Sequence, residues 1–381
     1  MTNQPAPFPG SARPQVPGDR SGSTVLLVLG FVLVGLCGLV ITPVVLLATG
    51  PVAFVVGAAF AVVPVAPLLA YFAWLDRYEP EPRGLLVFAF GWGAAVATLG
   101  SLVLNTASVL VLDAAGRDPE FVSVAVVAPV VEEALKGLGI LAIVLVGRRS
   151  LDGVVDGLVY AGVVGVGFAF VENILYLGAA LLDGGGAGLV GTFVVRGIVS
   201  PFAHPLFTAP IGVAVAVAVR RGGIRWAWVA VGYVVAVLLH GVWNGSAVSS
   251  PETFLVGFVL LQLPLFAAYV ALALWARHRE GRLIHLHLAP YVQVGWLSTG
   301  EFAMLGSLRT RRHALQAVRR GPDGARRGAA LKRFQRCAVQ LAFLRNRMLR
   351  GTAPRDARAR EYDLLQAVSS LRAVVGRAPV A

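Results

Sequence analysis

Long apolar runs fill the first 275 positions of this 381-residue chain, and no other feature of the sequence constrains its fold as strongly. Hydrophobic residues make up 57% of the chain and charged residues 14%, whereas about a quarter of a soluble domain is charged. A helix needs about 20 mainly apolar residues to cross the hydrocarbon core of a bilayer. Eight segments meet this requirement: 24–48, 51–75, 84–112, 121–146, 154–181, 188–219, 226–248 and 253–275. The sequence therefore predicts an all-α, polytopic membrane helix bundle with about eight transmembrane helices.

The sixth of these segments, 188–219, is too long for one straight span. It also contains Pro201, Pro205 and Pro210, and proline removes a backbone donor and breaks or kinks a helix. Two interpretations stay open, namely one broken helix that crosses the membrane or a re-entrant piece followed by a helix.

The connections between the segments predict the orientation of the chain. Residues 1–23 are rich in Pro, Gly and Ser and indicate a disordered cytoplasmic leader. The run 24–48 is longer than the apolar core of a signal peptide, so we expect a retained span. Alternate connections carry the basic residues Arg77, Arg83, Arg148, Arg149, Arg220, Arg221 and Arg225. Because cytoplasmic loops collect Lys and Arg, we expect a multi-pass protein of the plasma membrane with both termini in the cytoplasm.

The charge of the chain, +13 overall, belongs to its C-terminal part. Residues 276–381 hold 21 of the 33 Lys and Arg but only 6 of the 20 Asp and Glu. The segments 302–319, 329–349 and 360–375 have helical periodicity with Arg on the polar face, which predicts a basic, partly helical cytoplasmic tail after a transmembrane domain at 24–275. Basic amphipathic surfaces beside a membrane bind anionic lipid headgroups. Nucleic acid is not expected as a partner, because no aromatic interleaving accompanies the arginines.

Three charged residues interrupt the fourth apolar segment. An ionisable group at the centre of a span costs about 2.5 to 3.5 kcal/mol on insertion scales, so such groups mark protein interiors and functional sites. Glu132 and Glu133 precede Lys136 by four and three residues, so the ammonium can reach either carboxylate. A structural ion pair is one interpretation. Two carboxylates with one cation leave an excess acid, however, which suits a general base or a metal ligand.

The fifth segment places Phe168 and Glu172 on one helix face, with Asn173 beside them. This Glu and Asn pair is compatible with a hydrogen bond to a neighbouring helix as well as with a catalytic role. Asp152 and Asp156, by contrast, stand at the start of the helix, where carboxylates cap free N–H groups and meet the helix dipole. We expect a structural role for these two aspartates.

The remaining polar residues lie in the sixth and seventh segments. A stripe spaced by four residues follows one face of the sixth segment, provided that the helix persists through its prolines: Arg196, Ser200, His204 and Thr208. In the seventh segment His240 and Asn244 are again four apart. A single buried histidine is more often a core residue than a ligand, but two at mid-span in an otherwise histidine-free membrane region favour a functional site.

Depth along each span can be estimated from a helical rise of about 1.5 Å per residue. Counted from the outer end, Glu133 lies roughly 18 Å deep, Glu172 roughly 14 Å and His240 roughly 12 Å. These residues therefore share one layer in the outer half of the bilayer. The sequence predicts that four spans converge on one polar cluster.

At these positions the sequence resembles the PrsW family of intramembrane proteases, within the superfamily of CAAX-processing and bacteriocin-processing membrane proteases. The similarity covers roughly residues 70–250 and rests on four motifs in order, together with a stretch at 76–82: Glu-Glu-x-x-Lys at 132–136, Phe-x-x-x-Glu-Asn at 168–173, the His204 segment, and His-x-x-x-Asn at 240–244. The resemblance implies that 24–275 is a protease domain that hydrolyses a membrane-anchored protein. A single-span substrate such as an anti-sigma factor would fit.

The same resemblance implies roles for individual residues. Glu133 or Glu132 would activate a water molecule, and His204 and His240 would orient that water or bind a metal ion. Asn244 could donate to the oxyanion, and the pair Glu172 and Asn173 would complete the catalytic set. Lys136, Phe168 and Arg196 would support it. If the enzyme is a metalloprotease, Glu133, His204 and His240 form a ligand set compatible with Zn²⁺.

Two other functions are compatible with buried charges in a membrane. The glutamates and His240 could form the path of a proton- or cation-coupled transporter, in which helices broken at mid-membrane are common. A non-catalytic membrane scaffold is the other alternative. For the protease, a metal mechanism and a glutamate mechanism without metal both fit these residues.

Overall fold

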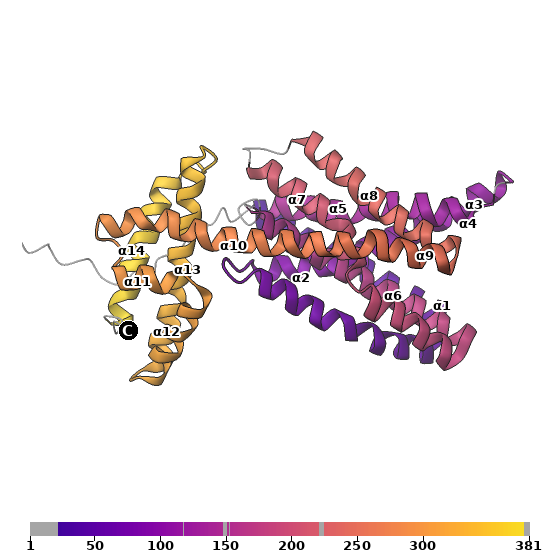
Figure 1. Ribbon diagram of the computed structural model, residues 1–381, viewed down its shortest axis with the longest axis horizontal. Helices are drawn as coiled ribbons and strands as arrows, with labels where there is room; N and C mark the ends of the chain where they lie inside the picture. The colour runs from indigo at the N-terminus through magenta and orange to yellow at the C-terminus, as the bar shows by residue number, and fades with distance from the viewer. Residues whose placement is uncertain (1–21, 117, 148–150, 152, 221–224, 377–381) are drawn as a thin grey trace, which may run out of the picture. The chain divides into compact units, whose positions relative to one another are not determined.

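The computed structural model describes residues 22–116, 118–147, 151, 153–220 and 225–376, which are helical with no strand among them (Figure 1). Most of the expected leader, together with Arg148, Arg149, Asp152 and Arg221, lies outside the described residues. The described chain forms two compact units, one ending at Glu280 and one beginning at Gly281. The first contains, in order, α1 (Gly22–Leu75), α2 (Arg83–Gly91), η1 (Trp92–Ala97), α3 (Thr98–Ala114), α4 (Glu120–Val122), η2 (Ser123–Val127), α5 (Ala128–Gly147), α6 (Val154–Phe193), η4 (Val194–Val199), α7 (Ala203–Arg220), α8 (Trp226–Ser249), α9 (Pro251–Gly257), η5 (Phe258–Gln262) and most of α10 (Leu263–Gln293).

Five stretches of the described chain are long and apolar enough to cross a membrane: Thr24–Leu75, Arg83–Ala114, Val154–Arg220, Trp226–Ser249 and Pro251–Gln293. The two longest, of 52 and 67 residues, far exceed the roughly 20 residues that one crossing needs. Each of these two contains a glycine with a non-helical backbone and positive φ, Gly50 (φ 74°, ψ 162°) and Gly185 (φ 59°, ψ −147°). Glycine adopts such angles without a steric penalty, so α1 and α6 each consist of two helices joined at the glycine. The all-α, polytopic membrane fold expected from the sequence is confirmed.

The expected sixth segment is a single broken path. After Gly185 the chain turns back, so that a Cβ added to Gly188 would lie 2.5 Å from the Ala180 carbonyl oxygen. The path then continues through the π-helical turn η4 and resumes as α7. The interpretation of one continuous polar stripe is wrong, because the helix stops at Ser200 (φ −127°, ψ 35°). Ser200 precedes Pro201, and a residue before proline is disfavoured from the α conformation.

Helix α6 forms the centre of the first unit and packs against α1, α7 and η1 (Figure 1). Small residues allow this close packing. A Cβ atom added to Gly162 would lie 2.0 Å from the Phe72 ring, and one added to Gly212 would lie 2.1 Å from the Gly157 carbonyl oxygen. Close backbone approach at small residues is the usual means by which membrane helices associate. The first half of α6 is thereby buried on all sides over much of its length.

Buried acids of the connection at 76–82 bind a backbone group of the connection itself and a side chain of α6. The Glu81 backbone N–H donates to Asp76 Oδ2 at 2.8 Å, and the Tyr160 hydroxyl of α6 donates to Glu81 Oε2 at 2.6 Å. Burial raises the pKa of Asp76 to about 7, although the hydrogen bond from the Glu81 backbone opposes the rise. The pKa of Glu81 is also raised, first by burial and then by the nearby Asp156 carboxylate. At the start of α6, Asp156 Oδ2 accepts the Gly153 N–H at 2.7 Å, which agrees with the structural role expected for Asp156.

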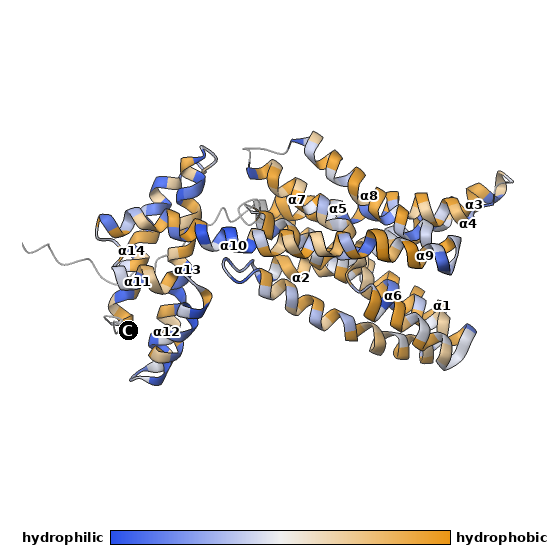
Figure 2. Ribbon diagram, in the orientation of Figure 1, coloured by the Kyte–Doolittle hydropathy of each residue, from blue (hydrophilic) through white to orange (hydrophobic). Residues whose placement is uncertain are grey.

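The second unit holds the end of α10 and four further helices, α11 (Thr299–Leu305), α12 (Leu308–Arg320), α13 (Gly324–Leu349) and α14 (Ala357–Val375). Helix α10 continues to Gln293, well past the end of the expected span at 275. The segment 302–319 is divided between α11 and α12 because Ser307 caps a new helix by accepting the Thr310 N–H at 3.1 Å. Figure 2 shows many hydrophilic residues on α12 and α13, whereas hydrophobic residues dominate the helices of the first unit. An ion pair between Arg372 and Glu301, 2.6 Å long, joins α14 to α11.

Candidate active site

The charged motif of α5 faces the interior of the first unit. Lys136 is fully buried, and its Nζ lies 2.9 Å from Glu133 Oε1 and 3.3 Å from Glu132 Oε2. The third ammonium hydrogen is directed to His204 Nδ1 at 3.1 Å, and the ammonium lies 3.9 Å from the centre of the Phe168 ring. Since an ammonium has three donors, these contacts satisfy Lys136 completely.

Helices α7 and α8 supply the other partners of Glu133. Thr208 donates its hydroxyl hydrogen to Glu133 Oε2 at 2.9 Å, and His240 Nδ1 lies 3.0 Å from Oε1. Both oxygens of Glu133 are therefore engaged, and its side chain has no exposed surface. The His240 ring stacks on Phe207 with ring centres 4.8 Å apart, which fixes the plane of the imidazole.

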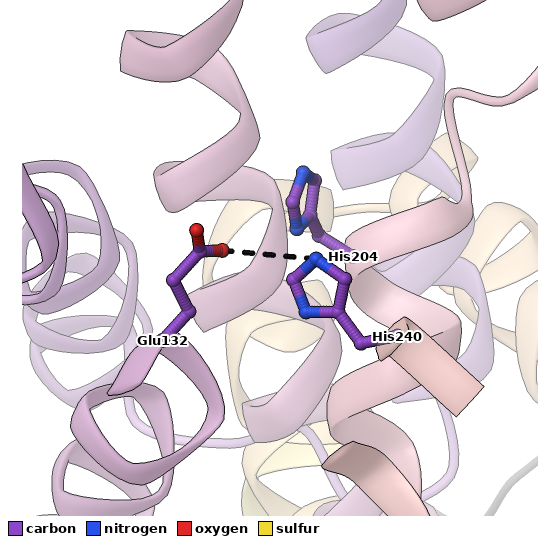
Figure 3. A group of neighbouring side chains, drawn as sticks. All are labelled: Glu132, His204 and His240. Atoms are coloured by element: carbon purple, nitrogen blue, oxygen red, sulfur yellow. Dashed lines mark ion pairs between the residues drawn. The ribbon is translucent and has the colours of Figure 1, made fainter. Parts of the chain in front are cut away.

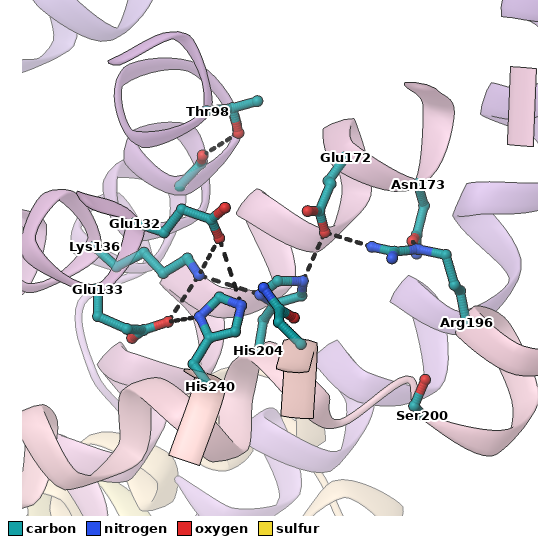
Figure 4. Close-up of polar contacts among 12 residues, drawn as sticks. Thr98, Glu132, Glu133, Lys136, Glu172, Asn173, Arg196, Ser200, His204 and His240 are labelled. Atoms are coloured by element: carbon teal, nitrogen blue, oxygen red, sulfur yellow. Dashed lines mark hydrogen bonds and ion pairs between the residues drawn. The ribbon is translucent and has the colours of Figure 1, made fainter. Parts of the chain in front are cut away.

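Glu172 of α6 connects the two sides of the break at Ser200. Arg196 on η4 and His204 on α7 both bind Glu172 Oε2, the latter at 2.7 Å. Arg196 also donates through Nε to Asn173 Oδ1 at 2.7 Å. Figure 4 shows these contacts as one connected row that runs from Glu133 to Arg196, with Ser200 outside it. Four helical paths thus meet at one cluster.

The hydrogen bonds assign the tautomer of each histidine. A carboxylate only accepts and an ammonium only donates. His240 therefore donates from Nδ1 to Glu133, which leaves the Nε2 lone pair free on the side of Glu132, 3.8 Å from Oε2. His204 donates from Nε2 to Glu172 and presents the Nδ1 lone pair to Lys136. In metal centres a carboxylate that binds one ring nitrogen commonly orients the other toward the ion.

A group of three side chains could hold a metal ion, namely Glu132, His204 and His240, whose ligand atoms lie within 4.8 Å of one another (Figure 3). Glu132 stands here in place of Glu133, the carboxylate expected from the sequence, because both oxygens of Glu133 already bind protein groups. Two histidines and one glutamate are the donors of known catalytic zinc sites. These residues fit a divalent metal ion, although Lys136 now contacts two of the three.

The formal charges of the buried cluster do not balance. Its members include the three carboxylates of Glu132, Glu133 and Glu172 and the two permanent cations of Lys136 and Arg196. With both histidines neutral, the cluster carries a net charge of −1. One further positive charge, such as a proton, is therefore needed to offset the excess acid in a low-dielectric interior.

Asn244 lies apart from the connected row. Its Nδ2 donates to the Val124 carbonyl at 3.0 Å, in the π-helical turn η2 that leads into α5. Ser200 has a comparable contact, since its hydroxyl donates to the Val195 carbonyl in η4. π-helical turns leave backbone groups without their usual helical partners and occur frequently at functional sites. The Asn244 hydrogen bond links α8 to η2, the turn that leads into α5.

Asn105 of α3 also contacts the cluster and was not among the site residues predicted from the sequence. Its Nδ2 lies 3.5 Å from Glu132 Oε1, on the side of the carboxylate away from Lys136. An asparagine in an apolar run, between Leu104 and Thr106, was the available signal. It carries no charge, however, and so did not stand out from the other polar residues of the spans.

The fold and the cluster define a polytopic membrane protein with ionisable side chains buried inside its helix bundle. The family model described as PrsW family intramembrane metalloprotease matches residues 81–273, half of the chain, and the chain belongs to this family. It is 28% identical over 187 residues to Protease PrsW of Geobacillus kaustophilus (strain HTA426), covering 48% of this chain and 76% of that protein. It is 30% identical over 184 residues to Protease PrsW of Bacillus subtilis (strain 168), covering 48% and 78%. No solved structure matches the chain.

Membership confirms the resemblance drawn from the motifs. The protein is an intramembrane protease, and therefore a hydrolase that resides in a membrane as a multi-pass protein and acts on a membrane protein. The transporter and scaffold alternatives are set aside by this assignment.

Proposed function

We propose that this protease cleaves a membrane-anchored protein with a water molecule activated by Glu132. The supporting observation is the difference between the three carboxylates. Both oxygens of Glu133 and one oxygen of Glu172 accept short bonds from cations or from donors of fixed position. Glu132 has longer contacts, 3.3 Å to Lys136 and 3.5 Å to Asn105, so it is the carboxylate best able to accept a proton.

In the proposed reaction Glu132 removes a proton from water as the water oxygen attacks the scissile carbonyl carbon. The proton then passes from Glu132 to the amide nitrogen as the carbon–nitrogen bond breaks, which releases an amine and a carboxylic acid. Lys136 offsets the growing negative charge next to Glu132, since preorganised cations in a dry site act strongly. Glu133 and Glu172 hold the two histidines in place.

Glu132, His204 and His240 would hold the metal ion, and Zn²⁺ is the ion whose preferred donors they match. When bound, zinc would lower the pKa of a water ligand and polarise the substrate carbonyl. The two oxygens of Glu132 face different partners, Oε2 toward the histidines and Oε1 toward Asn105. One oxygen can therefore serve as a ligand while the other accepts a proton.

The test compares Glu132→Gln with Glu120→Gln, a matched change at an exposed glutamate at the start of α4. Both variants are co-expressed with a panel of single-span reporter proteins carrying a C-terminal tag. We expect wild type and Glu120→Gln to release the tagged fragment and Glu132→Gln to lose at least 100-fold in rate, as for a general base. Cleavage by Glu132→Gln at the wild-type rate would refute the role of Glu132.

The metal is tested separately by mass spectrometry of the purified protein. Zinc at one equivalent in wild type and much less in His240→Ala is the expected result. Full zinc occupancy in His240→Ala would place the ion elsewhere. Activity in wild type without bound metal would favour the glutamate mechanism.

For the substrate we propose a single-span protein such as an anti-sigma factor, cut in the outer half of the membrane. We further propose that the chain lies in the plasma membrane with both termini in the cytoplasm. The basic connections support this orientation under the positive-inside rule. A fluorescent protein that matures only in the cytoplasm, fused to the C-terminus, should be bright. A dark fusion with normal expression would contradict the proposed orientation.

For the basic tail we propose contact with anionic lipid headgroups. Exposed basic side chains on α12 and α13 support it: Arg309, Arg312, Arg319, Arg320, Arg326, Lys332, Arg333 and Arg336. Each Lys or Arg near an anionic surface contributes about 1 kcal/mol. In nanodiscs containing the full chain, amine-reactive labelling of Lys332 should be slower with phosphatidylglycerol than with phosphatidylcholine alone. Equal labelling rates would refute the contact.

A further inference from the structure

The amide of Asn105 has a polar atom without a partner. Its Oδ1 is buried and accepts no hydrogen bond from any described residue. A buried amide oxygen without a hydrogen bond costs free energy, and in native proteins such an atom usually binds an ordered water. The Nδ2 atom of the same amide lies 3.5 Å from Glu132 Oε1, so the orphaned oxygen belongs to a side chain that touches the proposed base.

A second buried polar group without a partner lies near Asn105 on α3. Ser101, one helical turn earlier, is 3% exposed, and its hydroxyl likewise has no hydrogen-bond partner among the described residues. Residues four apart lie on the same helix face, so Ser101 and Asn105 together form a polar strip. Buried waters are found where several polar groups can each bind them. This strip, beside Glu132, has the chemistry of a water site.

A purely structural role for Asn105 accounts for less of the geometry. A side chain that only anchors Glu132 would be expected within about 3.2 Å and with its other polar atom satisfied. The observed contact is 3.5 Å, and the oxygen is left without a donor. A water molecule beside the two side chains could donate one hydrogen to Asn105 Oδ1 and the other to Glu132 Oε1.

We propose that Asn105 is a catalytic residue that holds the hydrolytic water against Glu132, an inference that rests on the proposed function. The amide oxygen accepts one hydrogen of the water and Glu132 accepts the other. Both hydrogens are thereby directed away from the substrate, and a lone pair of the water oxygen faces the scissile carbonyl carbon. As the new carbon–oxygen bond forms, the hydrogen bound to Glu132 transfers to that carboxylate, and the hydrogen bound to Asn105 stays on the oxygen. The proton on Glu132 goes to the leaving nitrogen when the carbon–nitrogen bond breaks.

This arrangement gives the two sides of Glu132 different functions. Lys136 and His240 lie on the Oε2 side, where positive charge and the histidine lone pair are found. Asn105 lies on the Oε1 side and is uncharged. A neutral acceptor orients water without competing for its proton, because an amide oxygen is a far weaker base than a carboxylate.

The test measures kcat and KM of the purified full chain on one single-span reporter that wild type cleaves. Asn105→Leu replaces the amide by an apolar group of similar shape, and Thr106→Val makes a similar change at the exposed neighbouring position. We expect Asn105→Leu to lower kcat about tenfold or more with KM unchanged, the size expected for loss of one hydrogen bond to a buried group. Thr106→Val should change neither constant. A wild-type kcat in Asn105→Leu would overturn the proposal.

A second variant keeps the proposal testable if Asn105→Leu does not fold. Asn105→Ala leaves room that a second water can occupy, so an intermediate loss of kcat, again without a change in KM, is expected. Wild-type kcat in Asn105→Ala, or a rise in KM alone in either variant, refutes the role. If wild type cleaves and Glu132→Gln does not, while both Asn105 variants match wild type, only the water-holding role fails. If Glu132→Gln itself cleaves normally, the proposed function has failed.

Discussion

Replacing Lys136 by Met should strongly destabilise the protein. The methionine has a similar length and no charge, and the position is fully buried. The Lys136 ammonium contacts two carboxylates, at 2.9 and 3.3 Å, and donates a hydrogen bond to His204 Nδ1. After the change Glu133 still accepts hydrogen bonds from Thr208 and His240. Glu132 keeps only its contacts with Asn105 at 3.5 Å and with His240 at 3.8 Å.

The size of the expected loss of stability follows from the buried carboxylates that would be left without the Lys136 cation. Removing one member of a buried ion pair costs about 3 to 5 kcal/mol, because the other charge stays buried without compensation. The Lys136 ammonium also lies 3.9 Å from the centre of the Phe168 ring. Loss of this cation–π contact adds about 0.5 to 2 kcal/mol to the destabilisation. For a domain of this size a loss of 3 to 5 kcal/mol lowers the unfolding midpoint by roughly 10 °C.

The assay is thermal unfolding in detergent, followed by tryptophan fluorescence, with Lys332→Met as the control. Lys332 is the other lysine of the sequence and is exposed. We expect a midpoint near the wild-type value for Lys332→Met and one about 10 °C lower for Lys136→Met. Equal midpoints for the two variants would refute the argument that Lys136 compensates buried carboxylates.

Adding zinc extends the same experiment. Since Lys136 contacts Glu132 and His204, its loss leaves two of the three candidate metal ligands free of competition. A ligand present at 100 times its Kd stabilises the folded state by about 2.7 kcal/mol. Zinc should therefore raise the midpoint of Lys136→Met more than that of wild type. A smaller rise in the variant would contradict competition between Lys136 and a metal ion.

Two further predictions concern the helix packing and the connection at 76–82. Gly212→Ala should greatly reduce the yield of folded protein, because the new Cβ would lie 2.1 Å from the Gly157 carbonyl oxygen. The control Gly184→Ala, whose Cβ would have nothing within 4 Å, should leave the yield unchanged. Similar yields of the two variants on size-exclusion chromatography would contradict this packing. Burial raises the pKa of Asp76 to about 7 from an ordinary value of 3.8. Between these two pH values the folded protein holds a proton that the unfolded chain releases. The free energy of unfolding should therefore fall as the pH rises from about 4 to about 7. Asp76→Asn keeps an acceptor for the Glu81 N–H and should flatten that dependence in unfolding experiments; an unchanged slope would contradict the assigned protonation.

Much of the fold was predictable because the bilayer imposes simple rules on composition. Apolar length located the helical segments, and the hairpin points at Gly50 and Gly185 fall close to the gaps predicted between them. The π-helical turns were not predictable, since they depend on contacts made only in the folded bundle. An example is the Trp92 indole, which donates to the Leu135 carbonyl at 2.9 Å from a distant part of the sequence.

The meeting of charged residues at one cluster could be anticipated because each buried charge is costly and needs partners. Which of the two glutamates shares the candidate metal-ligand group with the histidines could not be anticipated. Glu132 and Glu133 are adjacent in sequence, and either can reach Lys136 along the helix. The choice depends on α7 and α8. Thr208 and His240 occupy Glu133 and leave Glu132 with the weaker contacts. Sequence spacing along one helix carries no information about these neighbours.

The charge imbalance of the cluster connects its stability to its chemistry. Three carboxylates and two permanent cations within one buried group leave one negative charge unmatched. A structural ion-pair network would gain by matching its charges, because each uncompensated buried charge costs several kcal/mol. A hydrolase gains from the mismatch, since the unmatched carboxylate can accept the proton of water or bind a metal ion. Glu132, with its long contacts on both sides, is the carboxylate at which this excess charge is least satisfied, and the hydrolytic water should therefore be activated there.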